Sequence, residues 1–456
     1  MLNRRGFLAG AAGAIATPAL AAPASDLSLI ETASMRGTID STDFGVLPGG
    51  LDDQSKTFQR MLDRAGETDM PVFLPPGTYR VSNLTLPARL RLTGVAGATR
   101  IVYGGDGHLF IAENADLIEL SNIVFDGANR WIDERAQGLL DLRNVRDLAM
   151  DRCQVLGSGK YGLALERVGG RIDRTTVSGA AEAGIYSVEA ARLTISGNTV
   201  TDCGNGGILV HRWQPGDDQT IVTGNRVERI LARNGGTGQF GNGINIFRAG
   251  NVIVSGNSVA DCAFSAIRAN SASNIQIAGN TCQRSGETAV YSEFAFEGAI
   301  ISGNIVDGAA NGISMVNFNE GGRIAVCSGN IVRNMSTEGP YPADAPGFGV
   351  GITAEAECTV SGNVVENAPR YGMHLGWGPY LRNVVATGNV IRQANVGIAV
   401  SVVEGVGSAV ISDNVVEGAK GGAIVGYEWA KAVTGDMAAE GTGSLPRLTV
   451  ERNRVS

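Results

Sequence analysis

The feature that most constrains this chain is the tripeptide Ser-Gly-Asn, or a close variant, which recurs at nearly regular intervals. Successive asparagines are separated by 27, 32, 23, 24, 26, 33, 26 and 25 residues. A period near 25 residues that tolerates insertions predicts a solenoid. The asparagines of the series are Asn198, Asn225, Asn257, Asn280, Asn304, Asn330, Asn363, Asn389 and Asn414, and a weaker copy follows at Asn453.

Each repeat unit is predicted to contain three short strands. Alternating runs rich in Val and Ile precede and follow the asparagine, and about ten residues later a small residue precedes an apolar one, as in Gly243-Ile244. Period-2 alternation of this composition indicates strands. Asparagine suits a sharp turn because it tolerates the left-handed region and its amide bonds nearby backbone. Stacked coils would align these amides, so the unit is expected to form one coil of a right-handed parallel β-helix.

Two other repeat architectures fit less well. A helical solenoid is disfavoured because no 3.6-residue period survives in the unit and 64 of the 456 residues are Gly. A β-propeller blade needs about 40 residues or more. Weaker coils extend upstream, with Cys153 and Thr175 at the asparagine position. We therefore expect an all-β rod of roughly a dozen three-strand coils, about 55–60 Å long at ~4.8 Å per coil.

The N-terminus predicts export. Arg4-Arg5, a short apolar run and Ala19-Leu20-Ala21 resemble a twin-arginine signal with a cleavage site near Ala21. The apolar run is too short to span a membrane comfortably, although an N-terminal anchor is the alternative. We expect a signal peptide over residues 1–21, a linker over 22–40, one β-helix over 41–456 and a periplasmic or secreted protein. No membrane span would remain after cleavage.

Residues 41–101 resemble the N-terminal region of pectate-lyase-like β-helix proteins, through Asp43-Phe44-Gly45-Val46 and the run from Val72 to Tyr79. Phe58, Met61, Leu62 and Ala65 share one helix face, so a capping helix is expected, with Asp52 or Asp53 at its start. At the other end, residues 428–446 are expected to fold back as a cap, or else that end self-associates. Together with the export signal, the repeats resemble a twin-arginine-translocated β-helix family that is essentially uncharacterised. The resemblance implies the pectin lyase fold, which hosts lyases, hydrolases, epimerases and adhesins.

Composition excludes several kinds of partner and cofactor. The net charge of −8 and scattered basic residues argue against nucleic acid. Phosphate-binding, dinucleotide-binding and zinc motifs are absent from the sequence, so no cofactor is expected; Ca²⁺ is possible but no motif supports it. None of the six cysteines is placed for a disulfide, so they are expected to be small buried hydrophobes.

The outward positions of one strand series carry the candidate site. In each Gly-Ile pair the Ile is expected to point into the rod. The residues one and three places later then point outward, and over successive coils they form two columns. Two insertions, from Leu231 to Asn242 and from Asn334 to Gly349, enter this strand from the same side and carry aromatics, which suits a long polysaccharide partner. The candidate catalytic residues are Arg268, Tyr291, Glu293, Glu355 and His374. The candidate substrate-binding residues are Asn245, Asn270, Phe247, Thr353, His211 and Tyr341.

Three functions compete. A polysaccharide lyase is favoured, in which Arg268 would pair with a uronate carboxylate while Tyr291 or His374 transfers protons. The alternative for Arg268 is an ion pair with Glu293. An inverting glycoside hydrolase would use Glu293 and Glu355, predicted roughly 10 Å apart at the backbone. A non-catalytic glycan-binding or envelope-structural protein is the third. His211 and His374 lie six coils apart, roughly 29 Å, and so do not share one centre.

Overall fold

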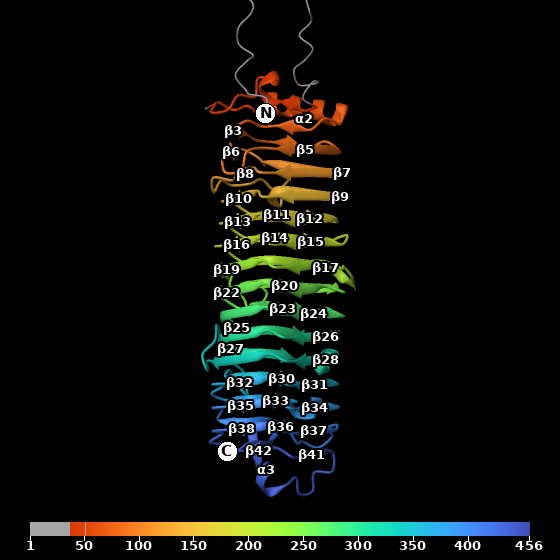
Figure 1. Cartoon of the computed structure of the whole chain (residues 1–456), viewed down its shortest axis with the longest axis vertical. Coiled ribbons are helices and arrows are strands. Elements are labelled where there is room, and N and C mark those ends of the chain that lie inside the picture. The colour runs from red at the N-terminus through yellow and green to blue at the C-terminus, as the bar shows by residue number, and fades with distance from the viewer. Residues whose placement is uncertain (1–36, 51) are drawn as a thin grey trace, which may run out of the picture.

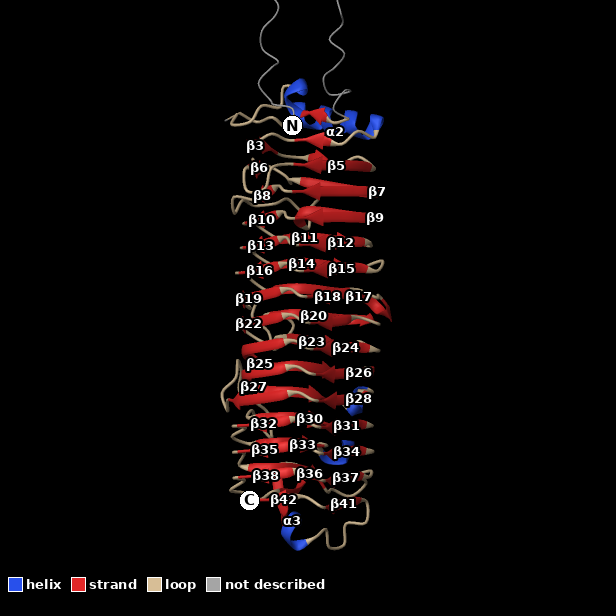
Figure 2. Cartoon of the chain, viewed as in Figure 1, coloured by secondary structure: helices blue, strands red, loops and turns tan. Residues whose placement is uncertain are grey.

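The computed structural model describes residues 37–50 and 52–456, which form one straight rod with the two ends of the described chain at opposite ends (Figure 1). The predicted signal peptide over residues 1–21 and nearly all of the predicted linker lie outside these residues. Within them the regular structure is almost entirely strand, joined by turns and loops, with a few short helices (Figure 2). No helix among the described residues is long and apolar enough to cross a membrane.

Each coil contributes three strands, and strands of successive coils pair in parallel. In one coil these are β20 (Asn242–Gly250), β21 (Ile253–Ser255) and β22 (Ser258–Cys262). Ile244 of β20 aligns with Ile208 of the preceding coil and with Ile267 of the next. The predicted right-handed parallel β-helix is confirmed, and because each strand lies on its equivalent, every position of the repeat becomes a column along the rod.

One series of strands forms the sheet that carries the candidate site. Its members are β7 (Phe110–Ser121), β9 (Gly138–Asp151), β11 (Tyr161–Glu166), β14 (Ala183–Val188), β17 (Gly206–Asp217), β20, β23 (Ile267–Asn270), β25 (Thr281–Glu293), β27 (Ile305–Met315), β30 (Val350–Ala354), β33 (Tyr371–Leu375), β36 (Val396–Ser401) and β39 (Ile424–Glu428).

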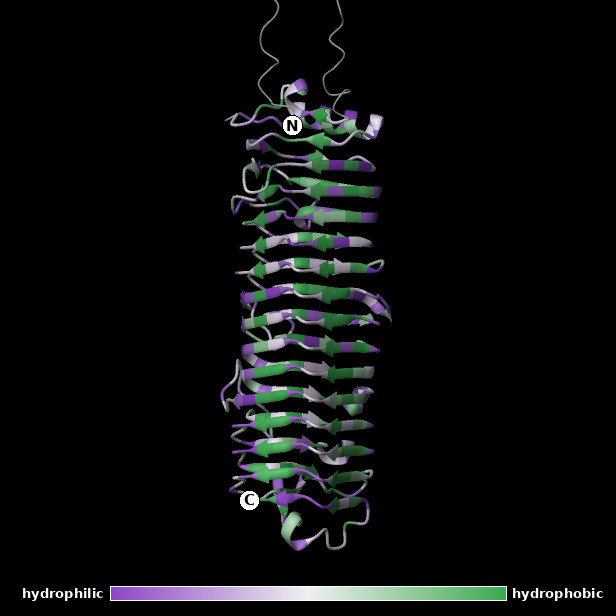
Figure 3. Cartoon of the chain, viewed as in Figure 1, coloured by the Kyte–Doolittle hydropathy of each residue, from purple (hydrophilic) through white to green (hydrophobic). Residues whose placement is uncertain are grey.

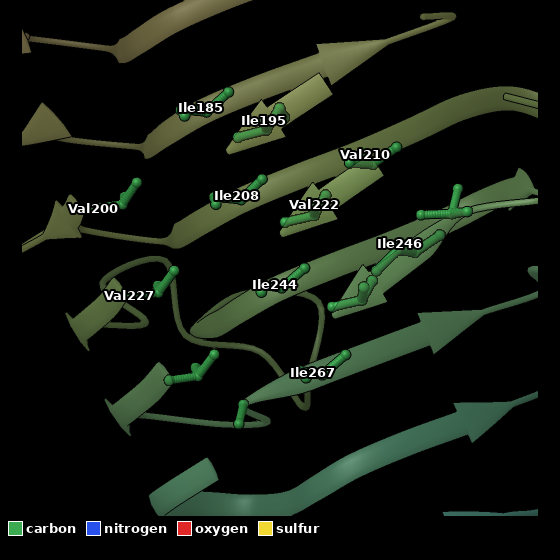
Figure 4. Packing of buried hydrophobic residues seen from close by; sticks show 14 of the residues in the cluster. Ile185, Ile195, Val200, Ile208, Val210, Val222, Val227, Ile244, Ile246 and Ile267 are labelled. Carbon is green, nitrogen blue, oxygen red and sulfur yellow. The ribbon is translucent and has the colours of Figure 1, made fainter. Parts of the chain in front are cut away.

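The interior of the rod is filled by aliphatic side chains that repeat from coil to coil (Figure 4). Ile208, Ile244 and Ile267 are fully buried, and Val200, Val227 and Val259 form a second buried column. Alternation of apolar and polar residues along the strands is visible over the whole rod (Figure 3). The six cysteines are free and buried, as predicted, and burial raises the pKa of each thiol.

The asparagines form a continuous buried hydrogen-bonded ladder at one corner of the coil. Asn304 donates from Nδ2 to the carbonyl of Ile277 at 2.9 Å and to Oδ1 of Asn330 at 3.0 Å. Its own Oδ1 accepts from the backbone N–H and the Nδ2 of Asn280. The same pattern continues to Asn453. Aligned amides were predicted, and they satisfy backbone groups that the turn leaves inside the rod.

The left-handed turn residue is the glycine of the tripeptide and not the asparagine. Gly303 has φ of 63° and Gly329 of 65°, whereas none of the Ser-Gly-Asn asparagines has a positive φ. Where glycine is missing, Arg174 and Asp413 take that conformation with φ of 48° and 57°. Glycine is therefore favoured because it enters this region without steric cost, and asparagine because of its side-chain amide.

The first coil is covered by α2 (Ser55–Thr68), which buries Phe58, Met61, Leu62 and Ala65 as predicted. The ring of Phe58 packs against Tyr79 and Phe110. Gln54 precedes the helix and makes no side-chain cap, while the carboxylate of Asp53 accepts from the backbone N–H of Ser55 at 2.9 Å. The helix thus closes the apolar interior that a solenoid end would expose.

The opposite end is covered by the segment predicted to fold back. Strand β40 (Lys431–Asp436) pairs antiparallel with β39, and α3 (Met437–Glu440) follows it. Met437 is buried in the core, and the carboxylate of Asp436 accepts from the backbone N–H groups of Ala423 and Ile424. The final coil is then completed by β41 (Leu448–Glu451) and β42 (Arg454–Val455).

Replacing Asn304 by Ala is expected to destabilise the rod by about 3 kcal/mol or more, because it removes one buried side chain that makes several hydrogen bonds and leaves its partners unsatisfied. Urea unfolding followed by circular dichroism measures this. Asn453→Ala, at the partly exposed end of the ladder, is the matched control and should cost clearly less. Equal losses for the two variants would contradict a cooperative role for the buried ladder.

Candidate functional site

The two predicted outward columns are present. Asn245, Arg268 and Tyr291 occupy aligned positions of β20, β23 and β25, and Phe247, Asn270 and Glu293 align two residues further along the same strands. The first column continues through Ser314, Thr353 and His374. Residues far apart in sequence therefore share one strip on the outer face of the sheet.

A cleft of about 400 Å³ opens where the first insertion meets this strip. Its floor comes from the strands and its wall from the insertion between β19 (Arg226–Ile230) and β20. The residues that line it are His211, Thr237, Gly238, Gln239, Phe240, Asn245, Phe247, Arg268 and Asn270. The structure thus brings five of the predicted site residues to one concave surface.

A buried cluster of charges lies at one side of the cleft. Nε of Arg268 lies 2.6 Å from Oε1 of Glu293, and Nη1 of Arg268 lies 3.5 Å from Oε2 of Glu287. Asn270 also donates to Oε1 of Glu293 at 2.9 Å. Both glutamates are 2% exposed and Arg268 is 9% exposed. One guanidinium therefore separates two buried carboxylates, and its pairing with Glu293 is one of the two alternatives that the sequence left open.

Burial and the neighbouring charges act in opposite directions on this cluster. Burial raises the pKa of the Glu293 carboxyl above its ordinary value, although Arg268 and Asn270 offset part of that effect. Burial also raises the pKa of Tyr291, whose ring lies 5.3 Å from the Arg268 guanidinium. Burial alone would lower the pKa of Arg268, but the Glu293 and Glu287 carboxylates raise it.

Glu287 is the functional candidate that the sequence analysis missed. It accepts a hydrogen bond from the hydroxyl of Tyr341 at 2.5 Å and one from Ser265 at 3.1 Å. The predicted columns lie one and three places after each inward residue. Ser265 and Thr288 instead lie two places before the inward Ile267 and Val290, and Glu287 directly precedes Thr288. Polar residues at that earlier column were the available signal.

The second insertion reaches the cluster through Tyr341. The Tyr341 ring packs on Phe264 and Phe348, with ring centroids 6.2 and 5.5 Å away, while its hydroxyl bonds Glu287, 54 residues earlier. Burial, followed by the nearby Glu287 carboxylate, raises the pKa of the Tyr341 hydroxyl. Both insertions therefore reach the charge cluster. The first lies beside Arg268 at Gly238, and the second contacts Glu287 through Tyr341.

Several polar atoms at this cleft have no hydrogen-bond partner among the described residues. They are Oδ1 of Asn245, Nη1 of Arg268 and Nε2 of His211, and all three are buried. Burial lowers the pKa of His211 to about 4, so its imidazole is neutral near pH 7. A buried polar atom without a partner is costly unless a bound molecule satisfies it, so these atoms mark the cleft as a candidate binding site.

Glu355 and His374 lie outside the cluster. The Glu355 carboxylate accepts from the backbone N–H of Phe318 at 2.8 Å, and burial raises its pKa to about 7.

His374 is four coils from Arg268, roughly 19 Å, and packs against Tyr371 and Trp377. Burial lowers the pKa of His374 to about 4. Thr353, which is partly exposed, aligns between the buried residues Ser314 and His374. The structure therefore joins Glu293 with Glu287, and not with Glu355.

No group of three or more His, Cys, Asp or Glu side chains within residues 37–50 and 52–456 is placed to hold a metal ion. The acidic cluster described above instead surrounds a guanidinium. The candidate chemistry of the cleft is consequently built from carboxyl, guanidinium and phenol groups.

Replacing Glu355 by Gln is expected to remove a pH-dependent loss of stability. The folded-state pKa is about 7 and the ordinary value 4.5, so the unfolded state loses its proton first as the pH rises. Stability from this group is full below pH 4.5 and falls by about 3 kcal/mol up to pH 7. Urea unfolding at pH 4.5 and 8 should show Glu355→Gln to be more stable than wild type only at pH 8. A constant difference would contradict the prediction.

Gly238→Ala is expected to disrupt the Arg268 ion pairs, because a β-carbon there would lie 1.7 Å from Nη1 of Arg268. Displacing one member of a buried charge cluster costs about 3 kcal/mol or more. Gly235→Ala in the same insertion is the matched control, since it also has positive φ but nothing within 4 Å. Urea unfolding should separate the two variants, and equal stabilities would show that Gly238 does not hold Arg268 in place.

Comparison with known proteins identifies the fold family. Solved structures of similar fold include the Azotobacter vinelandii mannuronan C-5 epimerase AlgE6 A-module, with TM-score 0.48, 16% identity, and coverage of 91% of this chain and 99% of that one. A GH87 α-1,3-glucanase from Streptomyces thermodiastaticus has TM-score 0.47, 15% identity and coverage of 92% and 69%. Pre-mature bacteriophage phi29 gene product 12 has TM-score 0.53, 13% identity and coverage of 93% and 60%.

At these identities the likeness extends to the fold alone. No curated protein sequence matches the chain. The family model described as "Right handed beta helix region" matches residues 99–227, 138–320 and 215–380, which together span more than half of the sequence. The chain therefore belongs to the right-handed β-helix family.

Proposed function

We propose that this protein binds a polysaccharide on the outer face of the strand series and hydrolyses a glycosidic bond beside the cleft, with Glu287 and Glu293 as the reacting carboxyl groups. The observation that carries the proposal is the pair of buried carboxylates on either side of one guanidinium, beside a cleft that the first insertion bounds and with Tyr341 of the second insertion on Glu287. Two carboxyl groups at a fixed separation are the usual requirement for glycoside hydrolysis.

The two carboxylates are close enough for glycoside hydrolysis by either stereochemical course, and we assign them the inverting one. Their contacts with Arg268 are 2.6 and 3.5 Å, so the contacting oxygens lie below about 9 Å apart across the planar guanidinium. Inverting glycosidases place their carboxyl groups about 6.5–9.5 Å apart to leave room for water. The second carboxyl of this pair is Glu287, in the place that Glu355 was expected to fill.

The roles follow from the surroundings of each carboxyl. Glu293, whose pKa burial raises, donates its proton to the leaving oxygen as the glycosidic C–O bond breaks. Glu287, held by the hydroxyls of Tyr341 and Ser265, takes a proton from the water whose oxygen bonds to the anomeric carbon. Arg268 holds the two side chains in position, and Asn245 and Asn270 offer amide groups to sugar hydroxyls.

The charge of the cluster favours a neutral sugar over a uronate. Arg268 supplies one positive charge while Glu287 and Glu293 together supply two negative charges when ionised, and all three side chains are buried. Opposite charges attract strongly where water is excluded, so Arg268 is already neutralised before substrate binds. While Glu293 holds the proton that it donates, Glu287 balances Arg268, so an incoming carboxylate would find no net positive charge at the cluster.

A polysaccharide lyase is the second candidate, and one observation favours it. Nη1 of Arg268 is buried without a hydrogen bond to any described residue and could donate to a uronate carboxylate. β-Elimination would then need a base for the C5 proton and an acid for the leaving oxygen, for which Glu293, Tyr291 and Tyr341 are the nearby groups.

The N-terminal sequence supports a second part of the proposal, that the protein is exported by the twin-arginine route to the periplasm or the exterior, where such polymers occur. Expression of the full chain with sequencing of the mature N-terminus tests this. A new N-terminus near Ala22 that disappears in Arg4→Lys/Arg5→Lys supports export, and an uncleaved chain retained in the cytoplasm contradicts it.

The activity itself is tested by incubating the protein with neutral polymers (laminarin, dextran, xylan, mannan) and anionic ones (alginate, polygalacturonate). New reducing ends without absorbance near 235 nm indicate hydrolysis, and that absorbance indicates a lyase. Retardation in affinity electrophoresis without turnover indicates a binding protein and contradicts the catalytic proposal. Absence of both binding and turnover contradicts the polysaccharide proposal as a whole.

Glu287→Gln and Glu293→Gln are each expected to lower kcat by about 10²–10⁴-fold on the polymer that is cleaved, because each removes a proton-transfer group while keeping its shape. Glu297→Gln is the matched control, since Glu297 is an exposed partner of Arg323 on β26 (Glu297–Ser302) and should leave kcat unchanged. Full activity in either of the first two variants would remove that residue from the mechanism.

A further inference from the structure

A row of aromatic side chains lies on the same outer face, on the N-terminal side of the cleft. Tyr161 stacks on Tyr186 with ring centroids 4.6 Å apart and planes inclined by 23°. Tyr186 contacts His211 at 5.5 Å, and His211 contacts Phe247 at 5.6 Å. All four rings are partly exposed. We call these four residues the aromatic row.

The aromatic row is continuous with the cleft. His211 and Phe247, its last two members, also line the cleft beside Arg268 and Asn270. The rings belong to four successive coils, from β11 to β20. Only His211 and Phe247 are aligned, while Tyr186 aligns with Ala164 and Leu209, so the row crosses the strands obliquely as it runs along the rod. No hydrogen bond from the Tyr161 or Tyr186 hydroxyl to another residue is found in the described part of the chain. Both phenols are therefore available to a ligand.

The face beyond the cleft in the other direction is closed. There the outward positions are filled by a separate apolar cluster of six residues on β30, β33, β36 and β39: Val350, Tyr371, Val396, Ala399, Val425 and Tyr427. Each is at most 8% exposed. The partly exposed aromatic residues that adjoin the cleft directly are therefore those on its N-terminal side.

We infer that the aromatic row is a run of sugar-binding subsites, so that the ligand is a long neutral polysaccharide that crosses several coils obliquely and extends from the cleft towards the N-terminal end of the rod. This inference rests on the proposed function. Flat aromatic faces contact the apolar faces of sugar rings, and phenol hydroxyls exchange hydrogen bonds with sugar hydroxyls. Five coils separate Tyr161 from Glu293, about 24 Å, which a short oligosaccharide does not cover.

The uncharged character of the row indicates the chemical class of the ligand. The members are two tyrosines, one phenylalanine and a histidine whose pKa burial lowers to about 4, so none carries charge near pH 7. Arg248 lies beside the row, with its guanidinium 4.7 Å from the Phe247 ring, and donates to the carbonyl of Trp213. A neutral chain is therefore favoured over a polyanion along this surface.

The test compares Tyr186→Ala with Tyr186→Phe on the neutral polymer from the panel above that wild type cleaves, and on its oligosaccharides of two to eight units. Tyr186→Ala is expected to raise KM for the polymer by about three- to tenfold, with kcat unchanged. KM for the shortest cleaved oligosaccharide should not change. Tyr186→Phe keeps the ring and loses only the hydroxyl, so it should raise KM less than Tyr186→Ala does.

Trp429→Ala is the matched control, because Trp429 is a 47% exposed aromatic beyond the closed part of the face. It should leave both constants unchanged. Tyr161→Ala provides a second variant and should act like Tyr186→Ala, and thermal unfolding verifies that each variant is folded. If the wild type cleaves a neutral polymer but Tyr186→Ala and Tyr161→Ala retain its KM at every length, the aromatic row is not part of the site. If no polymer is bound, the proposed function itself fails.

Discussion

The structure depends on one constraint, that each coil lies on the next without a shift in register. The buried asparagine ladder enforces it, because every amide bonds to the coils on both sides and a slip of one residue would leave those groups unsatisfied. The aliphatic columns inside the rod impose the same spacing through packing. Insertions are consequently confined to the turns between strands, where they do not disturb the stack.

Because the coils are in register, equivalent residues of successive repeats lie side by side and form one continuous surface. Each strand of the series adds a few outward side chains, and the strip becomes specific only through what neighbouring coils place beside one another. Arg268 meets Glu293 because their strands are paired, and it meets Glu287 in the part of β25 where the register with β27 shifts, between Ser285 and Thr288. The irregularity in an otherwise regular rod is therefore where the ionisable groups converge.

The two insertions bring further residues to the charge cluster on this strip. The first supplies Gly238, which lies so close to Arg268 that no side chain fits, and the second supplies Tyr341, which reaches Glu287. The same face is aromatic and partly exposed on one side of the cluster, and closed and apolar on the other. The two sides of the cluster therefore differ in their side chains, although both are built from the same repeat.

The amino-acid sequence alone determined the parallel β-helix, the asparagine ladder, the capping helix with its buried Phe58 and Met61, and the outward columns that hold Arg268 and Glu293. It could do so because all of these follow from a short period and from alternation along a strand. Only the tertiary structure decided that Glu287 and Tyr341 join the cluster, that Glu355 turns to the backbone of Phe318, and that His374 packs among aromatic rings. These contacts depend on the paths of irregular insertions and on a local shift in register, and no periodic pattern in the sequence specifies either.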